Sequence, residues 1–412
     1  MSPRWRTARE DEAILGVRPE LVCEPETLEE AREAVRESAG AARRLAFVGG
    51  GTDLELGAPP ERLDAIIRTS RLTRVVEHTP ADQIAVVETG VTLAVLQAAL
   101  RPHGQRLALD PPQPERATLG GIIASNAFGP RRARFGSVRD LLIGISIVRA
   151  DGTLARGGGK VVKNVAGFDL PRLMVGSLGT LGLIATATLR LHPLPQQEAT
   201  LLLPGLDGAR VRALVTAIRD AQLEPTSVAA LRRSDGRFDV AVRFEGFRAG
   251  VDEQRDRMTR LVIGDAQARC DLLDDAGARD FWKRHEGVRT VPPVRLRLSA
   301  LPSQIDAIAT QVLPGLEAAL DERGFVWYAT LGIGFFSGAP RDPVSAAEAI
   351  AAARSALQIL GGRLTLQAAP PSIRGRVEFW GAAPSALPLM RELKQRLDPE
   401  RRLAPGRFVG GI

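Results

Sequence analysis

Apolar and polar residues alternate with short periods along the first 195 residues, and the pattern predicts helices and strands in succession. Residues 26–39 place Leu28, Ala31 and Val35 on one helical face behind the capping-box pair Thr27 and Glu30. Further helices are expected from about residue 92 and at 169–175. Strands are predicted at 44–48, 65–67, 73–77, 84–88, 141–149 and 183–191.

A change of pattern follows Pro193 and Pro195, which indicate a domain boundary. Helices are then predicted at 207–221, 251–261, 303–320 and 345–360. The accompanying strands are 201–203, 227–231, 239–244, 294–298, 326–331 and 364–367. Two successive β-α-β groups predict an antiparallel sheet with helices on one side. We therefore expect an α+β chain divided into 1–195, 196–385 and a tail at 386–412.

Three glycines end the predicted strand at 44–48 and lead into Thr52 and Asp53. Glycine permits positive φ and leaves successive N–H groups unshielded, so these groups can converge on an anion such as a pyrophosphate. The spacing fits neither a P-loop nor a Rossmann fingerprint. A plain turn is the alternative interpretation of this loop.

Two more glycine-rich segments follow, at 117–126 and 175–182. Small residues in the first of them would let backbone lie against a flat ring, while Thr118 and Asn126 offer directed hydrogen bonds. The alternative is a tightly packed core turn. Three such segments in fewer than two hundred residues indicate a long ligand threaded between the halves of the first domain.

Composition excludes several classes of function. The 412 residues suit two domains, with 44% hydrophobic and 25% charged residues. The net charge of +7 is spread along the chain, and aromatic residues make up only 4%, so no nucleic-acid interface is expected. No apolar run approaches the ~20 residues of a membrane span, so direct membrane insertion is not expected and a cytoplasmic location is. Cys23 and Cys270 lie far apart and the histidines lack ligand spacing, so no protein-built metal site is expected.

Residues 44–195 resemble the FAD-binding domain of the vanillyl-alcohol-oxidase/PCMH family. The resemblance rests on the strings FVGGGTDLELG, ATLGGIIASNAFGPRRARFGSVRD and KVVKNVAGFDLPRLMVGSLGTLGLI. The second and third strings, with LDP and APGR in the tail, are similar to the glycolate oxidase branch of that family. The resemblance implies a PCMH-type FAD-binding domain of two subdomains at 1–195. It also implies an α+β cap domain with an antiparallel sheet at 196–385 and a tail that returns to the FAD domain.

The resemblance also implies a set of cofactor-binding residues, with the first loop on the FAD pyrophosphate. They are Gly49, Gly50, Gly51, Thr52, Asp53, Pro111, Thr118, Gly120, Gly121, Ala124, Asn126, Arg131, Gly136, Ser137, Asp140 and Ile184. Gly51 stands where members with covalent FAD carry a His, so a non-covalent FAD is expected. Lys163 and Asn164 are placed near the flavin by the same analogy, with a structural role equally open. No catalytic residue is identified, and His285 is the sole histidine of the cap.

The function implied is that of an FAD-binding subunit in a glycolate or 2-hydroxyacid oxidase complex. Its chemistry would be hydride transfer from a small 2-hydroxyacid to flavin. The partners would be a second flavoprotein subunit and an iron–sulfur subunit, through which the chain could associate with a membrane. Two alternatives stay open: a self-sufficient FAD-dependent hydroxyacid or alcohol dehydrogenase, and a non-catalytic flavin-binding assembly subunit.

Overall fold

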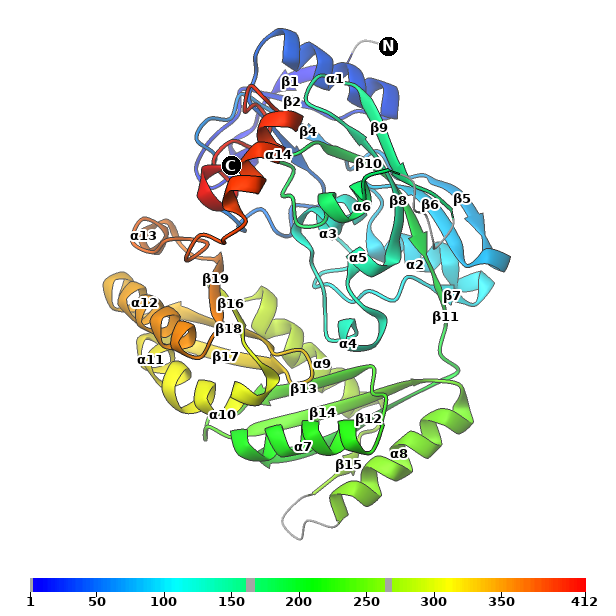
Figure 1. The fold of residues 1–412 in the computed structure, drawn as a ribbon, viewed down its shortest axis with the longest axis vertical. Helices are drawn as coiled ribbons and strands as arrows, with labels where there is room; N and C mark the ends of the chain where they lie inside the picture. The colour runs from blue at the N-terminus through cyan, green and yellow to red at the C-terminus, as the bar shows by residue number, and fades with distance from the viewer. Residues whose placement is uncertain (1–2, 161–166, 264–268) are drawn as a thin grey trace. The chain divides into compact units, whose positions relative to one another are not determined.

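The chain folds into two units, seen in a computed structural model that describes residues 3–160, 167–263 and 269–412 (Figure 1). Unit 1 comprises Met1–Gly129, Gly136–Leu194 and Ala382–Ile412, and unit 2 comprises Pro130–Phe135 and Pro195–Gly381. Lys163 and Asn164 lie outside the described residues. No helix in the described ranges is both long and apolar enough to cross a membrane.

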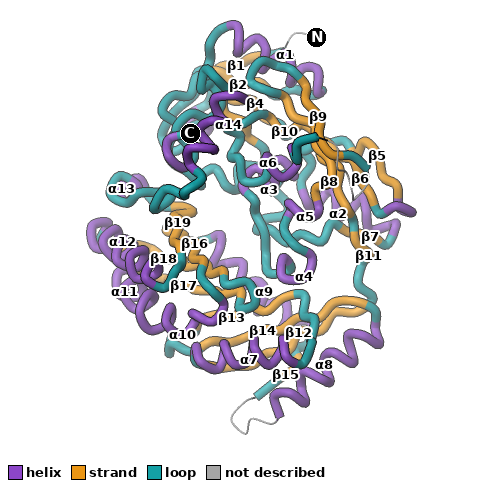
Figure 2. The backbone as a smooth tube through the Cα atoms, in the orientation of Figure 1, coloured by secondary structure: helices purple, strands orange, loops and turns teal. Residues whose placement is uncertain are grey.

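Unit 1 contains two sheets and a two-stranded pair (Figure 2). The first sheet has the order β1(Trp5–Thr7), β2(Leu21–Cys23), β4(Ala65–Arg68), β3(Leu45–Val48). The second, antiparallel throughout, has the order β5(Val75–Thr79), β6(Ile84–Glu88), β10(Leu183–Arg190), β8(Leu142–Val148), β9(Leu154–Gly158). The pair is β7(Gln105–Arg106) with β11(His192–Pro193). In the first sheet β2, β4 and β3 run parallel.

The helices of unit 1 cover these sheets. They are α1(Leu28–Gly40), α2(Leu93–Leu100), α3(Leu119–Ser125), α5(Val138–Leu141), α6(Leu170–Met174) and α14(Leu387–Leu397). Helix α1 begins at the predicted cap, since the Thr27 hydroxyl accepts a hydrogen bond from the Glu30 N–H at 3.2 Å. Val35 of α1, Leu45 of the first sheet and Leu183 of the second lie in one apolar cluster. The two sheets therefore share a core.

Unit 2 is built on one eight-stranded antiparallel sheet. Its order is β15(Asp271–Leu272), β12(Gln197–Leu206), β14(Phe238–Gly246), β13(Ser227–Arg232), β17(Leu320–Tyr328), β18(Ile333–Pro340), β16(Val294–Ser299), β19(Arg363–Ala368). Its helices are α4(Arg132–Phe135), α7(Gly208–Asp220), α8(Arg248–Ile263), α9(Asp275–Thr290), α10(Ile305–Ala307), α11(Leu313–Ala319), α12(Pro343–Ile359) and α13(Pro371–Arg374). The sheet predicted from the sequence is antiparallel as expected.

Helices lie on both faces of this sheet, where the sequence pattern predicted one face. Arg232 of β13 bonds Glu317 of α11, whereas Tyr328 of β17 bonds His285 of α9. Tyr328 pairs with Ala229, which points to the face opposite Arg232 because side chains alternate along a strand. Helix α9 escaped prediction because only Phe281, His285 and Val288 of its 16 residues are buried.

The segment Pro130–Phe135 groups with unit 2, although we expected all of 1–195 in one domain. Electrostatic contacts explain its placement. The Arg131 guanidinium donates to both carboxylate oxygens of Glu245 at 3.1 Å, and Arg134 forms an ion pair with Glu224 at 2.9 Å. Helix α4 also packs on β13. Arg131 and Arg134 follow the second glycine-rich segment directly in the sequence. The sequence pattern therefore did not distinguish them from the residues of unit 1.

Candidate functional site

The three glycine segments meet in unit 1 around one cleft. Gly49 and Gly50 pack closely against Thr118 and Arg116, which precede α3. A Cβ on Gly49 would lie 2.0 Å from the Thr118 hydroxyl oxygen, and one on Gly50 would lie 1.7 Å from the Arg116 carbonyl oxygen. Only glycine permits this approach, so the first two segments are packed together by their lack of side chains.

The second segment forms a helix, α3, rather than a turn. The Thr118 hydroxyl caps it by accepting from the Gly121 N–H at 3.3 Å, and Leu119, Ile122 and Ile123 are buried beneath it. Asn126 ends the helix in a left-handed conformation with φ of 53°. The half-buried side of α3, with Gly120, Gly121 and Ala124, can therefore lie along a ligand while its apolar side packs into the core.

The third segment is hydrogen-bonded to the end of α3. The Gly176 N–H donates to the Ile123 carbonyl and the Leu178 N–H to the Ala124 carbonyl, both at 2.9 Å. This brings Gly179 and Gly182 to the cleft wall beside Ala124. The three glycine segments therefore line one cleft.

The first loop presents a row of unsatisfied donors. Within the described residues, the N–H groups of Gly49, Gly50, Gly51, Thr52 and Asp53 donate no hydrogen bond to the protein. Gly51 has φ of +73°, which turns the loop in a left-handed step. Ser125 of α3 donates to the Asp53 carboxylate at 2.6 Å and holds the loop in place. Such a row of N–H groups suits a pyrophosphate, so the residues present fit FAD.

The C-terminal tail completes the cleft, a contribution that residue-level prediction missed. Arg407 donates to the carbonyls of Leu54 and Leu56 at 2.9 and 2.6 Å, and Ala404 lines the wall beside it. Ala404 is aligned by pairing with β3, because its N–H donates to the Leu45 carbonyl at 2.7 Å. The LDP and APGR strings of the tail could have indicated this contribution, because Ala404 and Arg407 belong to the second string.

A buried ion pair fixes this tail. The Lys394 ammonium of α14 donates to Asp398 at 2.7 Å and to the carbonyls of Thr180 and Leu403 at 2.8 Å. Burial lowers the pKa of Lys394, and the Asp398 carboxylate opposes that shift. One ammonium thereby joins α14, the tail and the third glycine segment.

The structure separates the predicted site residues into three groups. Nine line the cleft: Gly49, Gly50, Gly51, Thr52, Asp53, Gly120, Gly121, Ala124 and Ile184. Thr118 lies directly behind them. The cleft lining does not include Pro111, Asn126, Arg131, Gly136, Ser137 and Asp140. Lining residues absent from the prediction include Ile14, Thr69, Ser125, Leu178, Gly179, Gly182, Ala404 and Arg407.

Four of the predicted residues outside the lining make contacts elsewhere in the protein. Ser137 and Asp140 form the capping box of α5, with the Asp140 carboxylate accepting from the Ser137 N–H at 2.8 Å. Gly136 packs on Asp140, since a Cβ there would lie 2.7 Å from its carboxylate. Arg131 belongs to unit 2 and bonds Glu245. The buried Asn126 side-chain oxygen has no hydrogen-bond partner in the described part of the chain.

In unit 2, His285 lies buried within an aromatic and cationic cluster. Its Nε2 lies 2.8 Å from the Tyr328 hydroxyl, and the Arg243 guanidinium stacks 3.8 Å over the Trp282 ring. Burial lowers the pKa of His285 well below its ordinary value, and Arg289 and Arg243 add to the effect. His285 is therefore neutral at physiological pH.

Comparison with known proteins places the chain in a family. Residues 19–158 match the family described as "FAD binding domain". The chain is 30% identical to the glycolate oxidase subunit GlcE of Escherichia coli, over 89% of this chain and 93% of that protein. It is 27% identical to a D-2-hydroxyglutarate dehydrogenase of Xanthomonas citri, over 95% and 89% of the two chains.

Solved structures show the same fold. p-Cresol methylhydroxylase with substrate bound matches with a TM-score of 0.74 and 15% identity, over 95% of this chain and 89% of that one. Alkyldihydroxyacetonephosphate synthase matches with a TM-score of 0.72 and 20% identity, over 95% and 77%. These matches confirm the PCMH-type α+β fold predicted from the sequence, and the family match confirms FAD as the cofactor. The chain belongs to the PCMH-type family of FAD-dependent oxidoreductases that includes the glycolate oxidase subunit GlcE.

Proposed function

We propose that this chain is an FAD-dependent 2-hydroxyacid oxidoreductase and serves as a flavin subunit of a glycolate-oxidase-type complex. One observation carries the proposal: the likeness to the glycolate oxidase subunit GlcE extends over 93% of that protein, far beyond the FAD-binding domain. A second relative, the glycolate oxidase subunit GlcD of Bacillus subtilis, is 36% identical over 37% of this chain and 33% of its own.

The described residues suggest how the cofactor is held. Gly49 to Asp53 offer their N–H groups to the pyrophosphate, and Gly120, Gly121, Ala124 and Ile184 give flat contact along the rest of the molecule. When bound, FAD would supply the redox chemistry as the acceptor of a hydride from the substrate. Asn126 offers its buried amide oxygen as an acceptor. Gly136, Ser137 and Asp140 form the start of α5, and Arg131 anchors its own segment through Glu245. Pro111 stays a proposed cofactor contact.

Electrons leave the chain through partners in this proposal. Two cysteines are too few for an iron–sulfur cluster, and Cys23 is buried. An iron–sulfur subunit must therefore be a separate chain. A second flavoprotein subunit completes the 2-hydroxyacid pocket, and association with a membrane occurs through the complex.

A second candidate function is a self-sufficient FAD-dependent hydroxyacid dehydrogenase. The relative named D-2-hydroxyglutarate dehydrogenase favours it, because that likeness covers 95% of this chain. A D-lactate dehydrogenase of Archaeoglobus fulgidus is also 39% identical over 38% of this chain and 35% of its own. Both candidates share the flavin cleft and differ in the need for partners.

Anaerobic mixing distinguishes the two. The FAD-loaded chain is mixed with glycolate, lactate and 2-hydroxyglutarate, and loss of flavin absorbance is followed. We expect no rapid bleaching by the isolated chain and restored bleaching after co-expression with iron–sulfur and second flavin subunits. Rapid, saturable bleaching of the isolated chain would instead establish the self-sufficient dehydrogenase.

A further inference from the structure

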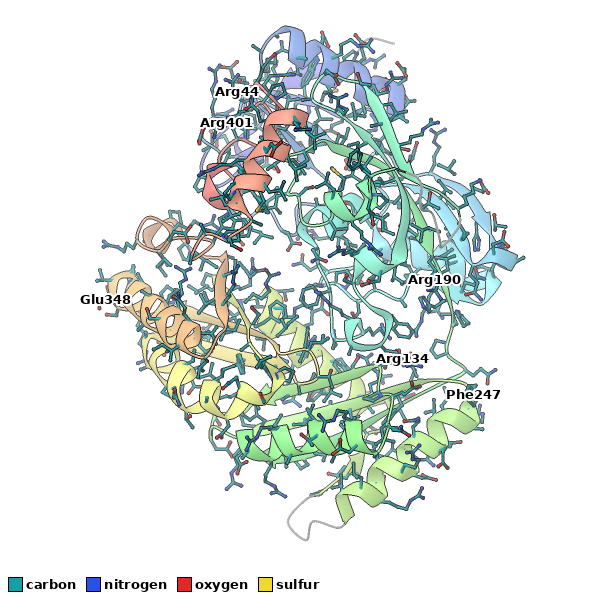
Figure 3. All side chains as sticks on the ribbon, in the orientation of Figure 1. Arg44, Arg134, Arg190, Phe247, Glu348 and Arg401 are labelled. Carbon is teal, nitrogen blue, oxygen red and sulfur yellow. The ribbon has the colours of Figure 1, made fainter. Side chains whose placement is uncertain are left out.

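A second cavity, within unit 2, has no part in the function proposed above. Its volume is about 600 Å³, and every residue that lines it belongs to unit 2. The walls come from α4, which carries Arg134 (Figure 3), from α7, and from the segments 223–225 and 301–303 with Thr330. These elements lie far apart in the sequence.

One face of helix α7, which carries both charged and uncharged side chains, lines this cavity. Arg212, Val215, Thr216 and Arg219 are spaced by three, four and seven residues, so they share a helical face. The neighbouring face of the helix, carrying Val211 and its buried companions, packs into the core. Arg212, Thr216 and Arg219 are exposed, so no other element covers the face that lines the cavity.

The charges around the cavity leave one guanidinium without a counter-ion. Arg134 is paired with Glu224 at 2.9 Å, and Arg219 donates to the adjacent Asp220 at 2.9 Å. Arg212 has no acidic partner among residues 3–160, 167–263 and 269–412. The single carboxylate in the lining, Glu224, is already engaged. The cavity therefore favours a monoanion, placed at Arg212.

The remaining lining is apolar with a few hydroxyls. Leu301, which is 65% exposed, forms part of the apolar lining. The apolar lining is Val215, Ile218, Leu223, Pro225, Leu301 and Pro302. The buried Thr330 hydroxyl has no hydrogen-bond partner in the described residues. A ligand with an apolar body would cover the exposed part of Leu301.

We propose that this cavity binds a small organic monoanion with an apolar body, such as a medium-chain carboxylate. The carboxylate pairs with the Arg212 guanidinium, and the chain lies along Val215 toward Leu301. This site is independent of the flavin cleft, and the proposal holds whichever hydroxyacid the enzyme oxidises.

Calorimetric titration of the full, FAD-loaded chain tests the site. Octanoate, below its micelle concentration, should bind saturably with one molecule per chain. Acetate, which lacks the apolar body, should bind at least tenfold more weakly, because each buried methylene adds about 0.8 kcal/mol. Octylammonium, with the opposite charge, should show no saturable binding.

Three variants locate the binding. Arg212→Ala should weaken octanoate binding about tenfold, the typical effect of losing a charge-assisted hydrogen bond. Thr216→Trp, at an exposed position, should fill the cavity and abolish binding. Arg260→Ala removes the same charge from α8, away from the cavity lining, and should leave the affinity unchanged.

The proposal is overturned if octanoate fails to bind, or binds equally to the Arg212→Ala or Thr216→Trp protein. Equal binding of octylammonium would also overturn it, since the charge at Arg212 would then have no role. Unchanged FAD content and melting temperature show that each variant is folded. Hydroxyacid turnover is a separate measurement, so failure here leaves the proposed function untouched.

Discussion

At the residue scale, the glycines of the first loop have two different physical roles. Gly49 and Gly50 allow close packing, because any side chain there would meet Thr118 or the Arg116 carbonyl. Gly51 instead occupies the left-handed region at φ of +73°, with only Leu54 within 4 Å of an added Cβ. The distinction decides which substitution disturbs packing and which strains the backbone.

Gly50→Ala should lower FAD affinity at least tenfold. The added Cβ would lie 1.7 Å from the Arg116 carbonyl oxygen, so the loop must move away from α3. Overpacking of this kind costs about 1–3 kcal/mol, and ~1.4 kcal/mol corresponds to a factor of ten. Flavin fluorescence titration measures the affinity. Gly40→Ala is the matched control, because nothing lies within 4 Å of its added Cβ; equal affinities for both variants would remove the loop from the site.

His285 should make the protein less stable below pH 6.5. Its folded-state pKa lies well below the ordinary 6.5, so the unfolded chain binds a proton first as the pH falls. The stability is complete above pH 6.5, and each lower pH unit removes up to about 1.4 kcal/mol until the folded pKa is reached. Thermal melts from pH 7.5 to 5.5 should show a smaller loss for His285→Gln. His192, whose pKa is also lowered, leaves a residual slope.

The matched control for this experiment is the parent protein, melted over the same pH range. Identical slopes for the parent and His285→Gln proteins would show that His285 does not titrate differently on folding.

At the scale of elements, helix α14 fixes the C-terminal tail through Lys394, which bonds Asp398 and the Leu403 carbonyl. Its amphipathic surface places most residues in solvent, yet Lys394 reaches inward to Asp398, which is fully buried. The same carboxylate accepts from the N–H groups of Arg402 and Leu403. The tail is thereby aligned with β3, and Ala404 and Arg407 reach the cleft.

Lys394→Met should destabilise unit 1 by about 3–5 kcal/mol, because it leaves the Asp398 charge buried without its partner. FAD retention should fall as well, since the Thr180 carbonyl and the tail lose their shared donor. Urea unfolding and the flavin content after gel filtration measure the two effects. Arg396→Met, which breaks an exposed pair with Glu392 on the same helix, should cost at most about 1 kcal/mol. Equal losses of stability and flavin content in the two variants would contradict the role of Lys394 in fixing the tail.

At the scale of the whole molecule, the cleft that we propose for the flavin is lined by several distant parts of the chain. Residues 46–54, α3, the strand β10 with its preceding segment, and the tail all line it. FAD binding should therefore stabilise the native state by mass action, with about 2.7 kcal/mol at a hundredfold excess over Kd. If the proposed site is right, binding of the cofactor and stability of the fold are coupled through this cleft.

FAD should be released when the whole protein is denatured. Gly51 stands where covalent members of the family carry a His, so no linkage is expected at this position. Acid precipitation should leave yellow, fluorescent FAD in the supernatant and a colourless pellet. A fluorescent pellet after repeated washing would demonstrate a covalent bond.

Local pattern was sufficient for much of this protein. The Thr27 cap of α1 and the strand before the three glycines follow from short-range chemistry, since caps and periodicity act over a few residues. The clustering of Gly49–Asp53 with Gly120, Gly121 and Ala124 was also expected, because backbone without side chains permits close approach and the strings resemble those of one family.

Long-range contacts settled the rest. Arg131 groups with unit 2 because its guanidinium bonds Glu245. The two residues are 114 positions apart in the sequence, so no local pattern shows their pairing. Arg407 and Lys394 reach the cleft and its neighbours through carbonyl groups, which every residue possesses and which carry no sequence signature. Helix α9 is held by His285 and Tyr328, brought together by a sheet of eight strands. Such contacts depend on which distant surfaces meet, and that is a property of the folded chain.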